Sequence, residues 1–335
     1  LATYRAARQA ALQLVDLLRT VPAAAAIDAH PGYLSARLGR ELAGEWGVPV
    51  VEVQHHHAHV VSVMAEHGAH GPVVGVAFDG TGYGPDGTIW GGEILHATAA
   101  GYTRVGHLRP IALPGGDAAI EHPARTALAH LWAAGVAWDA RLPAMAAVPE
   151  ADRQVLRTQL ERGVHTVPTS SMGRLFDAVA ALAGVRQRVD YEAQAAIELE
   201  AVLDPSATGA YAFPPADAAG AVDCAPVIRA VAADALAGTP APTISARFHT
   251  ALVSLVVHQL RTSAGDTSAR RGAVAGSTVV LSGGVFQNVW LADACEAALV
   301  REGCSVLTHR LVPTNDGGLA LGQAVIARAL LGGNG

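Results

Sequence analysis

The sequence predicts an α/β fold with two lobes, and three observations support this prediction. The chain has 335 residues, which is more than one hydrophobic core usually serves. In its first part, short apolar stretches alternate with helical ones, as is typical of a largely parallel sheet. An apolar stretch followed by glycines then recurs in both halves, without a repeat of fixed period.

The first 70 residues alternate between helix and strand. Leucines recur at helical spacing before Pro22, and a second helical pattern stops at Gly47. The elements expected here are helices at residues 3–19, 34–46 and 55–68, and strands at 23–27 and 48–53.

The middle of the chain changes to a hairpin and then to helices. Residues 73–78 and 89–96 are expected to be strands, and the glycine-rich stretch 79–87 is expected to be the turn between them. Helices are expected at residues 118–135, 174–184, 192–203 and around 251–260, whereas residues 204–243 show no clear period.

The end of the chain contains two further strand–turn–helix units. Strands are expected at residues 279–281 and 304–311. The first precedes a helix that starts at about Phe286, and residues 314–318 open the last helix.

The composition excludes several classes of protein. Hydrophobic residues make up 51% of the chain, which excludes disorder. A net charge of -6 without a basic block argues against nucleic acid and against an anionic membrane as partners. No stretch is typical of a membrane span or a signal peptide. The three cysteines form no C-x-x-C pair, so we expect a reducing, cytoplasmic location.

Four histidines lie within five positions, at 55, 56, 57 and 59. His55 and His59 are four residues apart, so on a helix they would share one face and suit one divalent ion. The alternative is a polar helix start with solvated imidazoles, which is commoner for an isolated pair. A strand precedes this cluster, and α/β folds place ligands at the C-terminal ends of strands, which favours the metal site.

Two aspartates could complete such a site. Asp79 and Asp316 each follow an apolar stretch and precede glycines. Two histidines with one or two carboxylates suit Fe or Zn and leave positions open for substrate. Taken singly, each Asp is more often a turn residue or a helix N-cap. Proximity to the histidines decides between these interpretations, and spacing alone does not show it.

Glycine runs favour a nucleotide cleft. They lie at residues 79–82, 282–284 and 317–318, where backbone N–H groups can approach phosphate. Each run alone is more often a plain turn. For Ser282, Gly283 and Gly284 we expect unpaired N–H groups that face the cleft.

Acidic residues on predicted helices are further candidates. Asp177 lies on a helical stretch, where it suits either ribose hydroxyls or a salt bridge to Arg174. Glu198 is a weaker case of the same kind.

Seven motifs, in order, together resemble the HypF carbamoyltransferases of [NiFe]-hydrogenase maturation, from about residue 3 to 331. They are VQHHHAH at 53–59, AFDGTGYG at 77–84, WGGE at 90–93, LPGGD at 113–117, SMGRLFD at 171–177, LSGGVFQN at 281–288 and NDGG at 315–318. One departure is the stretch 121–125, EHPAR, where the family commonly has EPWR.

The resemblance implies an ASKHA-type, actin- and Hsp70-like fold with a nucleotide and metal cleft between its lobes, related to TsaD. Residues 1–110 would form the first lobe with the histidine cluster. Residues 111–335 would form the second, with the nucleotide loops and a C-terminal part that returns to the cleft. The family's upstream acylphosphatase-like, zinc-finger and YrdC-like domains are not recognised in this sequence, so we expect a C-terminal portion of a longer protein.

The resemblance also implies an activity. In the family, the YrdC-like domain makes carbamoyl adenylate from carbamoyl phosphate and ATP. The domain resembled here transfers the carbamoyl group to the C-terminal cysteine of HypE, where it becomes the cyanide ligand of the hydrogenase iron. The expected partners are therefore HypE and the protein's own YrdC-like domain.

Site residues carry over by position. The expected metal ligands are His55, His59, Asp79 and Asp316, the first three also being catalytic. The expected nucleotide-binding residues are Ser282, Gly283, Gly284 and Asn288, with Asp177 at the ribose and Glu198 assisting. The expected cofactors are an Fe or Zn ion and ATP or AMP, with Mg²⁺ as a further candidate.

Two other functions fit the same residues. One is a different ASKHA-type transferase, which would act on a small-molecule hydroxyl or on a tRNA adenine. The other is an inactive fragment that binds nucleotide or metal.

Overall fold

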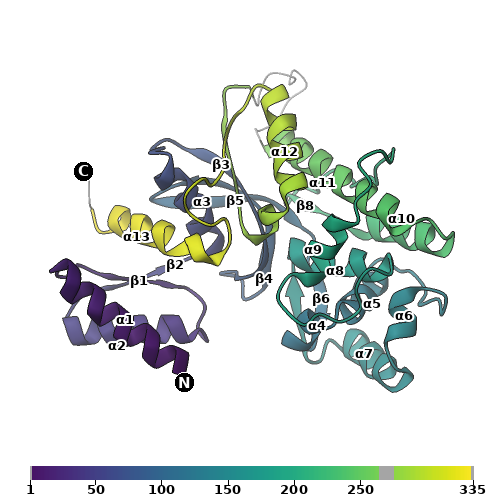
Figure 1. Cartoon of the computed structure of the whole chain (residues 1–335), viewed down its shortest axis with the longest axis horizontal. Coiled ribbons are helices and arrows are strands. Elements are labelled where there is room, and N and C mark those ends of the chain that lie inside the picture. The colour runs from purple at the N-terminus through teal and green to yellow at the C-terminus, as the bar shows by residue number, and fades with distance from the viewer. Residues whose placement is uncertain (1, 264–274, 333–335) are drawn as a thin grey trace.

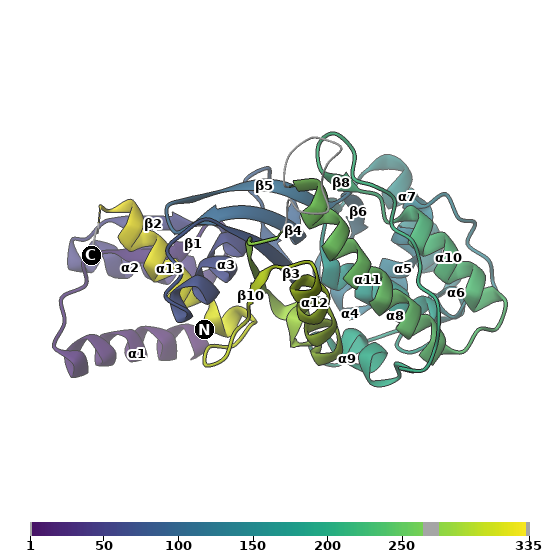
Figure 2. The same ribbon diagram turned by 90° about the horizontal axis from the view of Figure 1, so that it is seen from above.

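The computed structural model describes residues 2–263 and 275–332 and consists of a central mixed sheet with helices on both faces. One end of the elongated molecule carries α1, α2 and the β1–β2 pair, and the other carries α5 to α7 and α10 (Figures 1 and 2). An α/β fold was predicted, and it is confirmed.

The N-terminal end matches the predicted alternation. It consists of α1 (Ala2–Leu18), β1 (Ala25–Asp28), α2 (Leu34–Trp46), β2 (Val50–Val53) and α3 (His55–Glu66). The strands β1 and β2 are parallel, and α2 ends at Gly47 in a left-handed conformation. Glycine adopts this conformation without strain, which is why the helical pattern stops there.

The central sheet has the strand order β10-β9-β3-β4-β5-β8, with β7 beside β4 and β6 beside β7. Strands β10, β9 and β3 are parallel, whereas β3, β4 and β5 are antiparallel. The strands are β3 (Val73–Tyr83), β4 (Ile89–Thr98), β5 (Gly101–Leu108), β6 (Ile111–Pro114), β7 (Thr166–Thr169), β8 (Ala221–Val222), β9 (Thr278–Ser282) and β10 (Ser305–Leu307).

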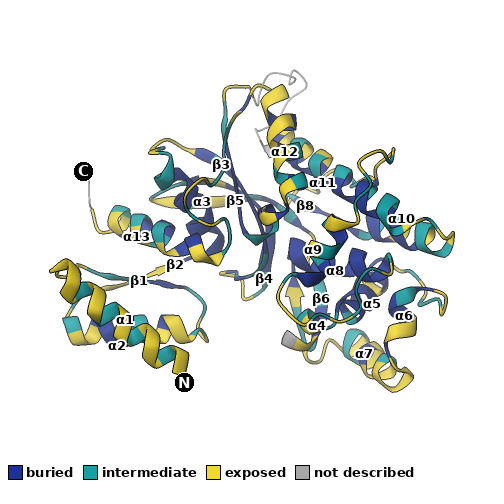
Figure 3. Cartoon of the chain, in the orientation of Figure 1, coloured by how far each residue is buried: buried dark blue, intermediate teal, exposed yellow. Residues whose placement is uncertain are grey.

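Both faces of this sheet are buried. Val76 and Phe78 belong to a large core shared with the helices beyond the sheet, whereas Ala77 belongs to a smaller core shared with α3. Successive side chains of a strand point to opposite faces, so Asp79 continues the face of Ala77, toward α3. Figure 3 shows the buried strands between the two helical layers.

The remaining helices lie mainly on the far side of the sheet from α3. They are α4 (Asp117–Glu121), α5 (Pro123–Ala133), α6 (Pro143–Ala147), α7 (Glu150–Arg162), α8 (Met172–Leu182), α9 (Gln194–Ala201), α10 (Ala225–Leu236), α11 (Ala241–Ser263) and α12 (Val289–Arg301). The last helix, α13 (Leu319–Leu330), returns to pack against α3 (Figure 1). No helix in the described ranges is long and apolar enough to cross a bilayer.

The hairpin prediction was wrong in one respect. Residues 79–83 were predicted as turn, but they continue β3, and the turn is confined to residues 84–88. The pairing with β4 shifts between Phe78 and Gly82 and then resumes, as at a β-bulge. Because glycine fits a bulge as well as a turn, composition did not distinguish them.

Other boundaries also differ from the predictions. The helix predicted at 118–135 breaks before Pro123, since proline lacks the N–H that would continue it. The helix predicted from Phe286 begins at Val289, after a short 3-10 turn. The strand predicted at 304–311 covers only Ser305–Leu307. Finally, the stretch 204–243 contains β8 and α10, whose alanines hid the helical period.

Candidate metal and nucleotide site

The start of α3 fixes the histidine cluster. Gln54 caps the helix, and its side-chain oxygen accepts a hydrogen bond from the His57 N–H. His55 and His59 then share one face of the helix, as the spacing predicted. His56 and His57 point elsewhere: His56 contacts the Gln54 side chain, and His57 donates to the Thr98 carbonyl.

Four predicted ligands meet at one point. Donor atoms of His55, His59, Asp79 and Asp316 all lie within 4.8 Å of one another. His55 Nε2 lies 3.2 Å from Asp79 Oδ2 and 3.5 Å from Asp316 Oδ1. His59 Nε2 lies 3.6 Å from each of these two oxygens.

These separations fit an ion bound between the donors. Two ligands held about 2.0–2.1 Å from a tetrahedral ion lie about 3.3–3.4 Å apart, close to the four distances observed. His59 Nε2 is fully buried without a hydrogen-bond partner among the described residues. A buried polar atom of this kind calls for a partner, and two imidazoles with two carboxylates suit Zn or Fe.

The electrostatics of the cluster point the same way. Burial would lower the pKa of His55, but the carboxylates of Asp28, Asp316 and Asp79 raise it well above its usual value. The pKa of His59 is also raised, because Asp316 and Asp79 outweigh its burial. Burial would raise the pKa of Asp79, yet His55 and His59 hold it well below its usual value. The same two histidines lower the pKa of Asp316 against the effect of its burial. Both carboxylates therefore stay charged and attract a cation.

Asp28, which was not among the predicted site residues, is a positioning group for this cluster. Its Oδ2 lies 2.8 Å from His55 Nδ1, and its Oδ1 accepts from the His30 N–H. Because the carboxylate accepts from Nδ1, the neutral ring presents the Nε2 lone pair to the other ligands. Asp28 ends a strand, as Asp79 was thought to do, so the same signal could have found it.

Residues 282–284, which we call the glycine loop, adjoin the histidine–aspartate cluster. The backbone N–H groups of its two glycines already have partners within the protein. Gly284 N–H donates to Asp79 Oδ1 at 3.0 Å, and Gly283 N–H donates to the Thr314 carbonyl. Ser282 is fully buried, with its hydroxyl 3.1 Å from His309 Nε2. The expected unpaired N–H groups are therefore not found at these two glycines. The hydrogen bonds of the loop instead join it to Asp79 and to Thr314.

The side chain of Asn288 already forms hydrogen bonds within the protein. Its side-chain oxygen caps α12 by accepting from Leu291 N–H, and its amide nitrogen lies 2.8 Å from His249 Nε2. Since His249 Nδ1 donates to the Ser245 carbonyl, its Nε2 accepts from the Asn288 amide. Asn288 thereby fixes the direction in which the glycine loop enters α12.

The two acidic candidates on helices have protein partners. Asp177 is buried, and its Oδ2 lies 2.7 Å from Arg174 Nε, the salt bridge that was the alternative to ribose binding. Glu198 pairs with Arg186 and accepts from the Gln194 amide. Their predicted contacts with nucleotide remain predictions.

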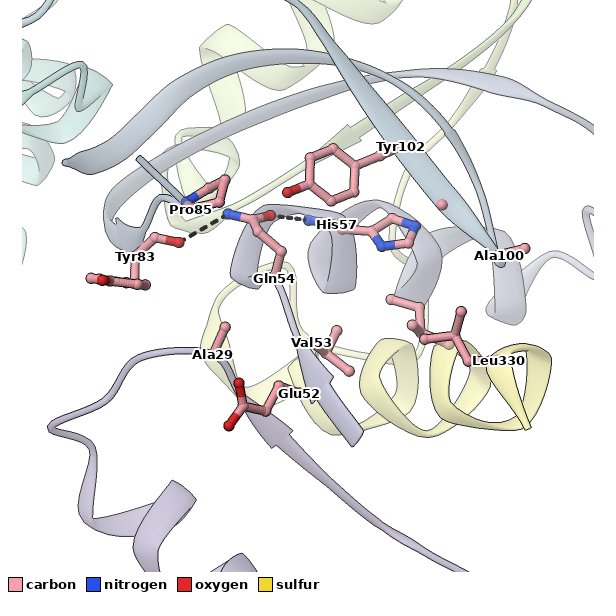
Figure 4. A pocket seen from close by; sticks show the side chains of 12 residues that line it. Ala29, Glu52, Val53, Gln54, His57, Tyr83, Pro85, Ala100, Tyr102 and Leu330 are labelled. Carbon is pink, nitrogen blue, oxygen red and sulfur yellow. Dashed lines mark hydrogen bonds between the residues drawn. The ribbon is translucent and has the colours of Figure 1, made fainter. Parts of the chain in front are cut away.

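A cavity of about 470 Å³ lies beside the start of α3, on the side of His57 rather than of the metal ligands (Figure 4). Tyr83, Tyr102 and Gln54 line it, and Gln54 donates to the Tyr83 carbonyl across its edge. None of the four candidate ligands lines this cavity.

Comparison with protein families matches two models along the chain. The model described as the HypF Kae1-like domain matches residues 1–66. The model described as "Carbamoyltransferase, Kae1-like Domain, second subdomain" matches residues 75–323.

Individual relatives agree with these models. A carbamoyltransferase HypF homolog from Cupriavidus necator is 38% identical, over 95% of this chain and 81% of that protein. A carbamoyltransferase HypF from Rhodobacter capsulatus is 39% identical over 99% of this chain, which spans 43% of that protein. A crystal structure of full-length HypF in its phosphate- and nucleotide-bound form is 37% identical with a TM-score of 0.86, covering 97% of this chain and 50% of that one.

Proposed function

The chain belongs to the HypF carbamoyltransferase family, and from this premise we propose that it catalyses the second half-reaction of that family. In this step the carbamoyl group passes from carbamoyl adenylate to the C-terminal cysteine thiol of HypE. The product would become the cyanide ligand of [NiFe]-hydrogenase. The chain spans less than half the length of most curated relatives, so this activity is a proposal for the chain.

One observation carries the proposal: the four-ligand cluster adjoins the glycine loop. Asp79 belongs to both, since its Oδ2 faces the histidines and its Oδ1 accepts from Gly284 N–H. His55, His59, Asp79 and Asp316 would hold the ion. When bound, it would act as a Lewis acid on a phosphate or carbamoyl oxygen of the adenylate.

The residues of the chain would bind and orient the substrate around this point. The phosphate of the adenylate would lie near the loop of residues 282–284 and the ion, and the ribose would lie near Asp177. His55, His59 and Asp79 are buried, so they would shield a carbamoyl group bound beside them from water on that side. Under this proposal, substrate would enter from the side of Asp316, the exposed ligand.

The acceptor thiol must come from a partner under this proposal. All three cysteines are buried, and burial raises the pKa of Cys304 as well as that of Cys224 and Cys295, which rises to about 12 in each. None forms a thiolate at neutral pH, so none suits a covalent intermediate. A flexible peptide tail that carries the acceptor cysteine avoids this barrier.

The test combines the chain, loaded with Zn²⁺ or Fe²⁺, with synthetic carbamoyl adenylate and a peptide of the HypE C-terminus. Mass spectrometry should detect a gain of one carbamoyl group on the peptide cysteine. A peptide with serine in place of the cysteine is the control. Tight nucleotide binding without transfer would instead support the inactive fragment, and transfer to serine would support an O-carbamoyltransferase.

A second experiment tests whether the chain catalyses the first half-reaction, the formation of carbamoyl adenylate. The chain supplied with carbamoyl phosphate and ATP should form neither AMP nor pyrophosphate, since the family assigns that step to its YrdC-like domain. Formation of both products by this 335-residue chain would contradict the half-reaction proposed here.

A further inference from the structure

The ligand Asp316 differs from the other three in its surroundings. Its side chain is 67% exposed, whereas those of His55 and His59 are 1% exposed. It follows an irregular segment, residues 308–315, which we call the strap. Leu311 on the strap is 90% exposed, so core packing does not hold this part of it.

Thr314 and Asn315, at the end of the strap, contact Gly283 and Gln287. Glu66 holds the earlier part of the strap, at residues 309–311. It is the last residue of α3, the helix whose start carries His55 and His59. Its Oε1 accepts from the N–H groups of Arg310 and Leu311, at 2.7 and 2.6 Å. Its Oε2 lies 3.0 Å from His309 Nδ1.

These contacts make Glu66 a strong acceptor. Burial would raise its pKa, but the Leu311 N–H, the His309 ring and the Arg310 N–H lower it to about 2. Because the carboxylate accepts from Nδ1 of His309, Nε2 of the neutral ring accepts from the Ser282 hydroxyl. The strap is thereby tied to α3 and also to the strand that precedes the glycine loop.

The residues that follow Asp316 in the chain are held by separate contacts with α3. Ser62 of α3 donates to the Gly318 carbonyl at 2.8 Å. A side chain at Gly322 would come within 1.9 Å of the Ala58 carbonyl oxygen, so α13 lies directly on α3. Asp316 lies between this close packing and the strap. The strap residue Thr314 also pairs with Gly283, since its carbonyl accepts from the Gly283 N–H and its hydroxyl donates to the Gly283 carbonyl. We expect Glu66 and this pairing together to limit how far the Asp316 carboxylate can turn.

We propose that Glu66 is a positioning residue for the metal site: by holding the strap, it places the exposed carboxylate of Asp316 against His55 and His59. Helix α3 would then supply two ligands at its start and fix the third from its end. This inference rests on the proposed metal site. Its physical basis is preorganisation, since an exposed ligand that is already in place loses less conformational freedom on binding.

A double-mutant cycle tests this role. The Zn²⁺ dissociation constant is measured by competition with a chelator for the parent, Glu66→Ala, Asp316→Ala and the double variant. Glu66→Ala should weaken binding about tenfold or more, as the loss of a supporting group around a metal typically does. In the Asp316→Ala background it should change nothing further, because the ligand it positions is absent.

Two variants separate positioning from general stability. Glu66→Gln retains an oxygen for the two strap N–H groups and should restore most of the affinity. Glu302→Ala removes an ion pair with Arg261 at the end of α12 and should leave Zn²⁺ binding unchanged. Thermal melts accompany all variants.

The outcomes are distinct. If the parent binds Zn²⁺ and Glu66→Ala weakens it equally with and without Asp316, the positioning role is wrong while the metal site stands. If Glu66→Ala binds like the parent, the packing of α13 and the pairing of Thr314 with Gly283 position Asp316 without Glu66, and the proposal is also wrong. If the parent binds no Zn²⁺, the metal site itself fails.

Discussion

At the scale of single residues, proton binding and metal binding compete at the cluster. The raised pKa of His55 means that, without an ion, this ring holds a proton at neutral pH, balanced by the surrounding carboxylates. An ion that takes its Nε2 must displace that proton. The same holds for His59, whose pKa is also raised.

The sign of the pH dependence follows directly. Metal affinity should rise with pH from about 6 to 8. Because the pKa values of His55 and His59 are raised, a proton competes for each Nε2 throughout this range, and the competition weakens as the proton concentration falls. Calorimetric titration in two buffers of different ionisation enthalpy should show proton release on binding. An affinity that stays constant across this range, with no proton released, would argue against imidazole ligands.

Asp177 gives a prediction in which stability and binding must be separated. The Arg174–Asp177 pair is buried on both sides, so Asp177→Asn leaves a buried guanidinium without its counter-charge. We expect a loss of about 3–5 kcal/mol in the free energy of unfolding, measured with denaturant. Combining it with Arg174→Met should recover most of that loss.

A different result would favour the nucleotide role of Asp177. If Asp177→Asn unfolds like the parent but binds AMP more weakly, its carboxylate serves the ligand and the pairing with Arg174 is incidental. Calorimetric titration of AMP into the folded variants provides that comparison.

The residues show what sequence could and could not predict. The spacing of His55 and His59 predicted a shared helical face, which the structure has. That Asp79 and Asp316 lie near them could not be read from spacing, because it depends on β3 and α13 packing against α3. Glu66 and His309 gave no signal, since a carboxylate at a helix end is usually solvated.

At the scale of elements, the backbone of the glycine loop packs closely against β3. Gly283 has φ +103, and a Cβ there would lie 2.2 Å from the Phe78 carbonyl oxygen. Its close approach to β3 sets the position of Ser282 and Gly284 beside the cluster. We therefore interpret this glycine as structural, whatever ligand the loop binds.

Gly283→Ala should destabilise the fold by about 3 kcal/mol or more, since it combines backbone strain with a clash against backbone. Gly163→Ala is the matched control, because Gly163 has φ +62 but nothing within 4 Å of its Cβ position. That control should lose only about 1–2 kcal/mol. Denaturant unfolding compares the two, and similar losses would show that the loop can move away from β3.

The elements also show why some boundaries were predicted and others were not. Gly47 after α2 ends a clear apolar period, so that boundary was predicted correctly. The strand character of residues 79–83 depends on pairing with β4, a contact made only in the folded molecule. Short partners such as β8, with two residues, carry no period that could be recognised.

At the scale of the whole molecule, α3 organises the site. It lies between the sheet and α13, and a side chain at Gly75 of β3 would meet Val60 at 2.3 Å. Ligands from β3 and from the 3-10 turn that precedes α13 thus converge on the histidines, because β3 and α13 pack on one helix. The division into lobes at residue 110 stays a prediction.

The function proposed above depends on one ion bound jointly by His55, His59, Asp79 and Asp316. Anomalous scattering from crystals of the chain, purified without added metal and analysed for its elements, tests this most directly. We predict one Fe or Zn peak at about 2.0–2.2 Å from both Nε2 atoms and both carboxylates. The peak should be lost in His59→Ala. A metal bound elsewhere, or an empty cluster in protein that has been saturated with both metals, would contradict the account.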